Sequence, residues 1–220
     1  MTLFLANEGE PGFDKLTDAA EVNAFFDTHF ADIVPLIPDL AETFLQNPTG
    51  ILGTVRCKRW TDGEHFLLLG DAAHAIVPFH GQGMNAAFED CRAFDIAIDQ
   101  FGNDWPALFA AVENERVANS NAIADMALEN YIEMRDSVND PAFKLQKALS
   151  FELERRLPRH FVPRYSMVMF HDEIPYADAQ ARGEVQKRLL AELANNASTL
   201  DDIDMDAAVS RVVEVLQELP

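Results

Sequence analysis

The amino-acid sequence predicts an α/β fold, with α+β character, that becomes mainly helical after residue 84. The first observation is the apolar run that follows His65 and ends at Gly70, which is typical of a strand buried on both faces. The second is the change to helical periodicity from Met84 onward, where apolar residues recur every three or four positions. A buried strand, a glycine-bearing turn and a helix together frame many α/β cofactor sites.

Strands and one helix are expected before residue 70. Residues 2–6 are apolar and predict a strand that ends at the polar turn 7–12. Asp18 can cap a helix that closes near Pro35 and Pro38. The residues that this helix would bury recur at helical spacing: Val22, Phe25, Phe26, Phe30 and Ile33.

Two further strands are expected on either side of the turn 61–64. Residues 51–60 and 65–69 would form them, and the Thr61-Asp62-Gly63-Glu64 sequence is typical of a hairpin connection. We therefore expect the two runs to pair.

Helices dominate the remaining chain. One would run from Met84 to about Gly102, with its apolar side formed by Phe88, Cys91, Phe94 and Ile98 and its polar residues, Glu89, Asp90, Arg92 and Asp99, mostly elsewhere. A second would start near Pro106 and reach about Arg135, with an apolar face of Leu108, Val112, Ile123, Met126 and Met134. Asp140-Pro141 starts another segment, which Pro158 and Pro163 interrupt, and the acidic chain beyond Pro175 also favours helix.

These elements suggest four parts along the chain. They are residues 1–60 with a strand, a helix and a strand, residues 61–102 with a strand, a turn and a helix, the helical residues 103–175, and the acidic helical tail 176–220.

Composition excludes several classes of function. The 220 residues carry 17 basic and 37 acidic side chains, and a net charge of −20 argues against binding to nucleic acid or to an anionic membrane surface. No run approaches the roughly 18 to 20 apolar residues that span a bilayer. The start has no basic flank of a signal peptide, so we expect a cytoplasmic protein with Cys57 and Cys91 as reduced core residues. The oligomeric state stays open.

A cofactor could be held where the strand gives way to the helix. Asp71 lies at the carboxyl end of the predicted strand, where it would either bind a ligand or cap the following turn. Gly81 and Gly83 leave room for a flat group, and the helix start beyond them favours negative charge. A GxG sequence alone is weak evidence for a cofactor site, because any tight turn can use it. The order of a strand, Gly-Asp and then GxG at a helix start is more specific.

The string GDAAHAIVPFHGQGMNAAFEDC, residues 70–91, resembles the second flavin-contacting motif of the aromatic-ring hydroxylases, the single-component FAD monooxygenases. Within that family it is most similar to the kynurenine-hydroxylating members, and ENYIEMR at 129–135 strengthens the resemblance. Residues 2–9 are also similar to a strand of the family's substrate-binding domain. The resemblance covers roughly residues 1–175 and leaves the acidic tail unmatched. It implies that residues 1–60 belong to a substrate-binding domain, that 61–102 form the second FAD-contacting segment and that 103–175 form the substrate-pocket region.

The resemblance implies an FAD site. Asp71 would accept hydrogen bonds from the ribityl chain, and Gly83, Met84 and Asn85, preceded by Gly81, would lie against the isoalloxazine ring. The expected reaction is the hydroxylation of L-kynurenine to 3-hydroxykynurenine in tryptophan degradation, with NADPH as the reductant. The protein would supply orientation and electrostatics, while the flavin supplies the redox chemistry.

The same resemblance places Pro78, Phe79 and His80 on the wall of the substrate pocket. His80 could titrate or donate a hydrogen bond near neutral pH and is the catalytic candidate, although a turn histidine that only packs is an equal alternative. His74 is expected to be structural.

The position of Asn130 among apolar residues makes it a candidate site residue. Met126, Asn130 and Met134 fall at i, i+4 and i+8, so the amide lies in an apolar stripe and must find a partner. The resemblance assigns Asn130, with Tyr165, to the amino-acid part of the substrate, and Met134 to the same pocket. Tyr165 could otherwise be a core aromatic residue with a hydrogen-bonded hydroxyl.

The chain departs from the family in one respect, since it contains no GxGxxG sequence to hold the ADP half of FAD. We therefore expect the C-terminal part of a two-domain FAD-dependent hydroxylase fold, inactive alone and with weak or absent FAD binding. The alternatives are a non-catalytic half-protein that binds a partner chain and a flavin hydroxylase for another aromatic substrate. A metal enzyme using Asp71, His74 and His80 is also conceivable, but we expect no metal.

Overall fold

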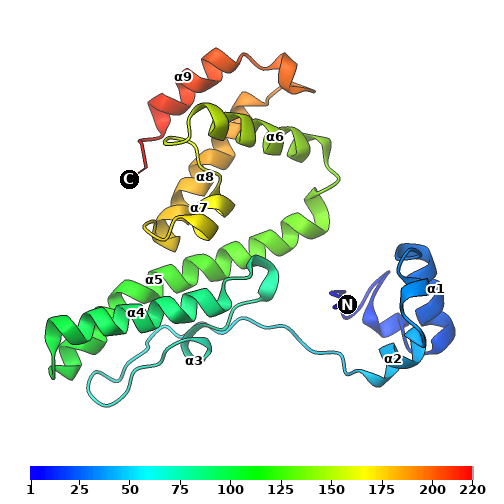
Figure 1. Ribbon diagram of the computed structural model, residues 1–220, viewed down its shortest axis with the longest axis horizontal. Helices are drawn as coiled ribbons and strands as arrows, with labels where there is room; N and C mark the ends of the chain where they lie inside the picture. Colours follow the sequence, from blue (N-terminus) through cyan, green and yellow to red (C-terminus); the bar gives the residue numbers. More distant parts are fainter. Residues whose placement is uncertain (220) are drawn as a thin grey trace. The chain divides into compact units, whose positions relative to one another are not determined.

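The computed structural model describes residues 1–219, which fall into two compact units (Figure 1). The first unit is Met1–Leu52 and the second starts at Gly53. The four-part division expected from the sequence stays a prediction. Within the described residues, none of the helices has the length and apolar character that crossing a membrane requires.

The first unit is built on two helices, α1 (Ala19–His29) and α2 (Leu40–Gln46), with short 3-10 turns η1 (Phe13–Lys15) and η2 (Val34–Leu36). The Asp18 carboxylate accepts hydrogen bonds from the N–H groups of Ala20 and Glu21, each at 2.9 Å, so the predicted cap is confirmed. Val22, Phe25 and Phe26 of the predicted face are buried together with Leu16. The predicted end near Pro35 and Pro38 is wrong, because α1 ends at His29, and Phe30 and Ile33 lie beyond it and are partly buried.

The predicted strands, and with them the α/β fold class, are wrong for residues 1–219, which are mainly helical. Of the expected pairing between 51–60 and 65–69, only a contact at the turn forms, where the Leu68 N–H donates to the Trp60 carbonyl at 2.7 Å. Residues 1–219 contain only two isolated bridges, a parallel one between Ala6 and Gly12 and an antiparallel one between Thr61 and Leu67. The N–H groups of Val55 and Cys57 donate to the carbonyls of Ala75 and Ala73, at 2.8 and 2.9 Å. A strand needs continuous backbone hydrogen bonds to a neighbouring strand. An apolar run provides side chains that can be buried in a sheet, but it does not provide that neighbour.

The second unit begins with the segment expected to hold a cofactor. A short helix α3 (Asp71–His74) and a 3-10 turn η3 (Pro78–His80) lead into α4 (Gly83–Phe101) and α5 (Trp105–Ile132). Helices α4 and α5 pack side by side (Figure 1). Gly102, at φ +58°, ends α4, and Asp104 caps α5, so both predicted boundaries are confirmed.

The buried face of α4 differs from the prediction. The helix buries Ala86, Asp90, Ala93 and Ala97, whereas Phe88 is 65% exposed. Cys91, predicted to be a core residue, is exposed, and Cys57 is half-buried. The alanines face α5 because their small side chains let the two helix backbones approach closely, which a phenylalanine stripe would prevent.

Helices at the end of the chain form a second core. After a π-helical turn η4 (Glu133–Ser137) come α6 (Pro141–Arg156), α7 (Arg164–Phe170), α8 (Tyr176–Leu193), a 3-10 turn η5 (Leu200–Asp202) and α9 (Met205–Val215). The apolar faces of α6, α8 and α9 meet in one cluster that includes Leu149, Leu153, Phe161, Leu189 and Val212, whereas Met167 of α7 packs in a separate cluster. The helical prediction for this part of the chain is confirmed.

Replacing Asp18 with alanine tests the role of the cap. Loss of both hydrogen bonds should destabilise α1 by about 1 kcal/mol and speed amide hydrogen exchange there about fivefold. Asp27→Ala, which removes an exposed carboxylate from the same helix, is the matched control. Equal exchange rates in the two variants would show that the cap contributes nothing.

Candidate flavin and substrate site

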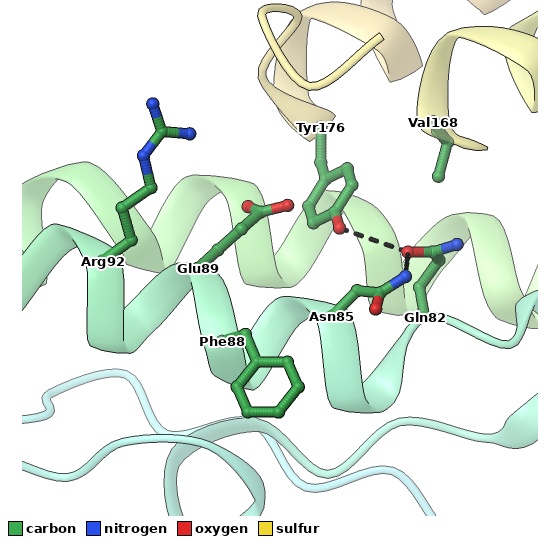
Figure 2. Close-up of a pocket in the computed structure, with 7 residues that line it drawn as sticks. All are labelled: Gln82, Asn85, Phe88, Glu89, Arg92, Val168 and Tyr176. Atoms are coloured by element: carbon green, nitrogen blue, oxygen red, sulfur yellow. Dashed lines mark hydrogen bonds between the residues drawn. The ribbon is translucent and has the colours of Figure 1, made fainter. Parts of the chain in front are cut away.

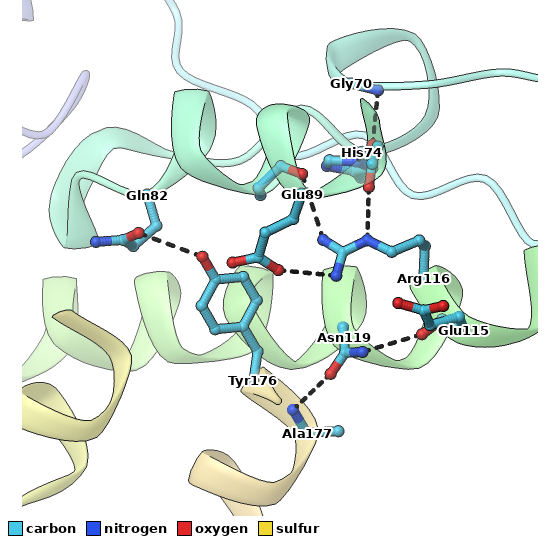
Figure 3. Close-up of polar contacts among 11 residues, drawn as sticks. Gly70, His74, Gln82, Glu89, Glu115, Arg116, Asn119, Tyr176 and Ala177 are labelled. Carbon is cyan, nitrogen blue, oxygen red and sulfur yellow. Dashed lines mark hydrogen bonds and ion pairs between the residues drawn. The ribbon is translucent and has the colours of Figure 1, made fainter. Parts of the chain in front are cut away.

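A buried carboxylate holds the turn that precedes the glycines. Asp90 of α4 is 0% exposed and accepts three hydrogen bonds, from the Gly70 N–H at 2.9 Å, His74 Nε2 at 2.5 Å and Arg116 Nε at 2.8 Å (Figure 3). These donors come from the start of α3, from within α3 and from α5. Asp90 therefore ties the turn to both long helices.

The network extends on both sides of Asp90. Arg116 also donates to Glu89 at 2.8 Å and to the Ala86 carbonyl at 3.3 Å. The buried Trp60 ring stacks on His74 with centroids 5.0 Å apart. The structural role expected for His74 is thus visible in its contacts.

The charge state of Asp90 follows from its partners. Burial alone would raise the pKa of this carboxyl, but the hydrogen bonds from His74, Arg116 and the Gly70 N–H outweigh it and hold the pKa below its usual value. Asp90 is consequently ionised at neutral pH and pairs with the buried Arg116 guanidinium.

The residues predicted to hold a cofactor lie on the exposed edge of this turn. Asp71 is the first residue of α3, is exposed and makes no side-chain hydrogen bond within residues 1–219. Helix α4 begins at Gly83 without a side-chain cap, so its first N–H groups remain available. Gly81 has φ +72° and open space where a Cβ would stand, and Met84 is 68% exposed. An uncapped helix start beside an unpaired carboxylate fits a flavin.

Gln82, between the two glycines, fixes the direction of this turn. Its side chain is buried, and its Oε1 accepts hydrogen bonds from Asn85 Nδ2 at 2.8 Å and from the Tyr176 hydroxyl at 3.3 Å (Figure 2). These residues line a small open groove of about 250 Å³ between α4 and α8. The side-chain amide nitrogen of the predicted cofactor residue Asn85 is thus already engaged in a hydrogen bond with Gln82.

A larger cavity of about 740 Å³ lies beside η3 and α5. Its walls come from η3, α5, α6, α7 and α8, and three of the predicted substrate residues line it: His80, Asn130 and Tyr165. Its volume falls in the range of roughly 300–1,000 Å³ that is usual for small-molecule sites. Pro78, Phe79 and Met134 do not line this cavity.

His80 lines the cavity and carries a buried polar atom without a hydrogen-bond partner in residues 1–219. The side chain is 6% exposed, its ring stacks on Tyr165 with centroids 5.1 Å apart, and its buried Nδ1 has no hydrogen-bond partner within residues 1–219. Burial, and then the positive charge of Arg164, lower the pKa of His80 below its usual value. The ring is therefore neutral at pH 7 and can exchange a hydrogen bond with a ligand.

Asn130 has the partner that its place in an apolar stripe requires. Its Nδ2 donates to the Phe79 carbonyl at 2.5 Å, which ties η3 to α5. The amide oxygen makes no hydrogen bond within the described part of the chain, so it remains available as an acceptor in the cavity. Met134, one turn further, is more than half exposed, and its sulfur lies 3.7 Å from Asn130 Nδ2.

Arg164 is a cavity residue that the sequence did not reveal. Its guanidinium pairs with Glu129 of α5 at 2.5 Å and with Glu184 of α8 at 3.6 Å. Its aliphatic part lies against Gly183, where a Cβ would clash with it. The glycine within α8 was the available signal, because glycine in a helix interior usually has a packing reason.

Asp90 and Arg116 were missed for a different reason. Charged residues on an amphipathic helix are usually assigned to the solvated face, and only the approach of α4 to α5 shows that these two meet. Within residues 1–219 no group of three or more His, Cys, Asp or Glu side chains could hold a metal ion.

Comparisons with known proteins find a matching family model and several similar proteins. A family model described as "FAD binding domain" matches residues 16–126. The kynurenine 3-monooxygenase of Stenotrophomonas maltophilia (strain K279a) is 48% identical over 212 residues, which are 96% of this chain and 46% of that protein. The protein of the same name from Xanthomonas oryzae pv. oryzae (strain PXO99A) is 46% identical over 99% of this chain and 47% of its own length. That from Legionella pneumophila (strain Corby) is 43% identical over 87% of this chain and 42% of its own length. The chain spans about half the length of the curated relatives it matches.

Substitution of Asp90 by asparagine tests the buried network. Leaving Arg116 without its carboxylate should lower the free energy of unfolding by about 3 kcal/mol. Because the pKa of Asp90 is lowered in the folded state, its contribution is complete above the unfolded value of about 3.9 and disappears as the pH falls through the folded value. Urea denaturation followed by tryptophan fluorescence should therefore show a constant difference at neutral pH that shrinks below about pH 4.

The matched control is Asp95→Asn, which changes an exposed carboxylate on the same helix. If both variants unfold at the same urea concentration, Asp90 does not hold the turn.

Proposed function

The chain belongs to the FAD binding domain family, and on this premise we propose that it forms the flavin-facing turn and the substrate pocket of an FAD-dependent aromatic monooxygenase. The proposed reaction is the hydroxylation of L-kynurenine to 3-hydroxykynurenine, as the names of its curated relatives suggest. We infer NADPH as the reductant from the hydroxylase family that residues 70–91 resemble. We propose further that this chain acts as the C-terminal part of such an enzyme and that residues 61–102 are its second flavin-contacting segment.

Two features of the turn support the flavin proposal. Asp71 carries a carboxylate that can accept hydrogen bonds from the hydroxyl groups of a ribityl chain, and the N–H groups of Gly83, Met84 and Asn85 stand at an uncapped helix start. That helix start favours the negative charge that a reduced flavin carries at its N1 edge. When bound and reduced, the flavin would supply the oxygen-activating chemistry.

The observation that carries the substrate proposal is the meeting of His80, Asn130 and Tyr165 in one cavity directly after the flavin-facing turn. Asn130 offers its amide oxygen and Tyr165 its hydroxyl to the amino-acid part of a substrate. His80, neutral and with Nδ1 unsatisfied, can hold a polar group on the aromatic ring in place. The apolar wall formed by Met126, Phe143 and Phe161 would exclude water from the ring.

Fusion to a dinucleotide-binding half tests the function as a whole. The N-terminal half of the Stenotrophomonas maltophilia protein, joined to these 220 residues, should give NADPH-dependent and L-kynurenine-dependent formation of 3-hydroxykynurenine. Turnover of salicylate but not of L-kynurenine would favour a hydroxylase for another aromatic substrate. If the fused protein forms no product, and the two halves mixed as separate chains co-elute in size-exclusion chromatography, a non-catalytic partner-binding protein would be favoured.

The chain alone should bind FAD weakly or not at all. It has no GxGxxG sequence for the pyrophosphate, which normally provides much of the anchoring of a dinucleotide. Quenching of flavin fluorescence on titration with the 220-residue chain measures this directly. Submicromolar affinity would overturn the expectation.

Asn130→Ala in the fused enzyme should raise the KM for L-kynurenine about tenfold, since a hydrogen bond to a charged group contributes roughly 1.5–3 kcal/mol. Asn114→Ala, at an exposed position of the same helix, should leave KM unchanged. Unchanged kinetics in Asn130→Ala would remove this residue from the substrate site.

A further inference from the structure

Two helices that follow α5 in the chain, α6 and α8, each line the 740 Å³ cavity with one face. Helix α8 lines the cavity with Gly183, Gln186, Lys187 and Leu190, at i, i+3, i+4 and i+7. Helix α6 does the same with Phe143, Gln146, Lys147, Ser150 and Phe151. Each face therefore contributes one lysine to a single cavity.

Neither lysine forms an ion pair within the part of the chain that the structure describes, although the whole chain carries a net charge of −20. The carboxylates that line this cavity belong to Glu129 and Glu133, and Glu129 is engaged by Arg164. Two lysines and one carboxylate, Glu133, thus line the cavity without an ion pair within residues 1–219, which leaves an excess of one positive charge that suits a negative ligand.

A neutral donor accompanies the lysines. The carboxamide of Gln146 lines the same wall and makes no hydrogen bond within the described part of the chain, so its N–H groups are free to donate. Ammonium and carboxamide donors together suit an oxygen anion, because such bonds are charge-assisted and an oxyanion accepts several of them.

We propose that Lys147 and Lys187, with Gln146, form an oxyanion subsite at the α6–α8 end of the cavity, which binds a carboxylate or a phosphate group. The subsite goes beyond the proposed monooxygenase function, because oxyanion binding requires neither flavin nor turnover. The carboxylate would come from an amino acid that enters the cavity and the phosphate from a nucleotide. Both lysine side chains are exposed, so binding is weak and is screened by salt.

The test uses the 220-residue chain without flavin or nucleotide, so that its result does not depend on the proposed reaction. Inorganic phosphate and L-kynurenine are titrated separately while the ¹³C-labelled lysine ε-methylene signals are followed by NMR. At least one probe should give saturable shifts of the Lys147 and Lys187 signals that weaken as NaCl is added. Phosphate alone identifies a phosphate subsite, L-kynurenine alone a carboxylate subsite, and saturation by neither probe overturns the proposal.

Variants assign the effect to the two lysines. Lys147→Gln and Lys187→Gln should each weaken binding about tenfold, whereas Lys147→Arg, which keeps the charge, should stay within about threefold of the parent chain. The matched control is Lys144→Gln, because Lys144 is exposed one turn earlier on α6 and does not line the cavity. An equal loss in Lys144→Gln would show a nonspecific charge effect and overturn the subsite.

Discussion

The contact on which the second unit depends is the buried ion pair between Asp90 and Arg116. An ionised carboxylate without exposure to water is tolerated only when its oxygens are fully used, and here a guanidinium, an imidazole and a backbone N–H use them. The hydrogen bonds to Gly70 and His74 fix the start of the turn, and Gln82 fixes its end. Asp71 is thus presented from a rigid frame, although its own side chain is exposed.

Helix α5 connects this frame to the cavity. It carries Arg116 in its middle and Asn130 near its end, and 14 residues of α-helix separate them by about 21 Å. Asn130 in turn holds η3 through the Phe79 carbonyl. The segment from Gly70 to Phe79 is therefore bound at its start to Asp90 of α4, which pairs with Arg116 of α5, and at its end directly to α5. A displacement of α5 would therefore move the flavin-facing turn and the cavity wall together.

Small residues permit the close packing that this arrangement needs. The alanines of α4 allow it to approach α5 closely enough for Asp90 to reach Arg116. Gly183 has the same effect in α8, where the helix tolerates the conformational cost of a glycine because the Arg164 side chain occupies the space of a Cβ. Arg164 then bridges α5 and α8 beside His80, and its charge helps to keep that imidazole neutral.

The sequence by itself determined the long helices from α4 onward, the start of α1 at Asp18, the end of α4 at Gly102 and the identity of the motif, because periodicity, capping residues and the 70–91 string are local properties of the chain. It also singled out Asn130, since an amide in an apolar stripe must be satisfied. Only the tertiary structure decided that residues 51–60 and 65–69 are not strands, that α4 buries its alanines rather than Phe88, and that Asp90 and Arg164 are central. The physical reason is that ladder partners, helix approach and ion pairing depend on residues far apart in the chain, which no local pattern records.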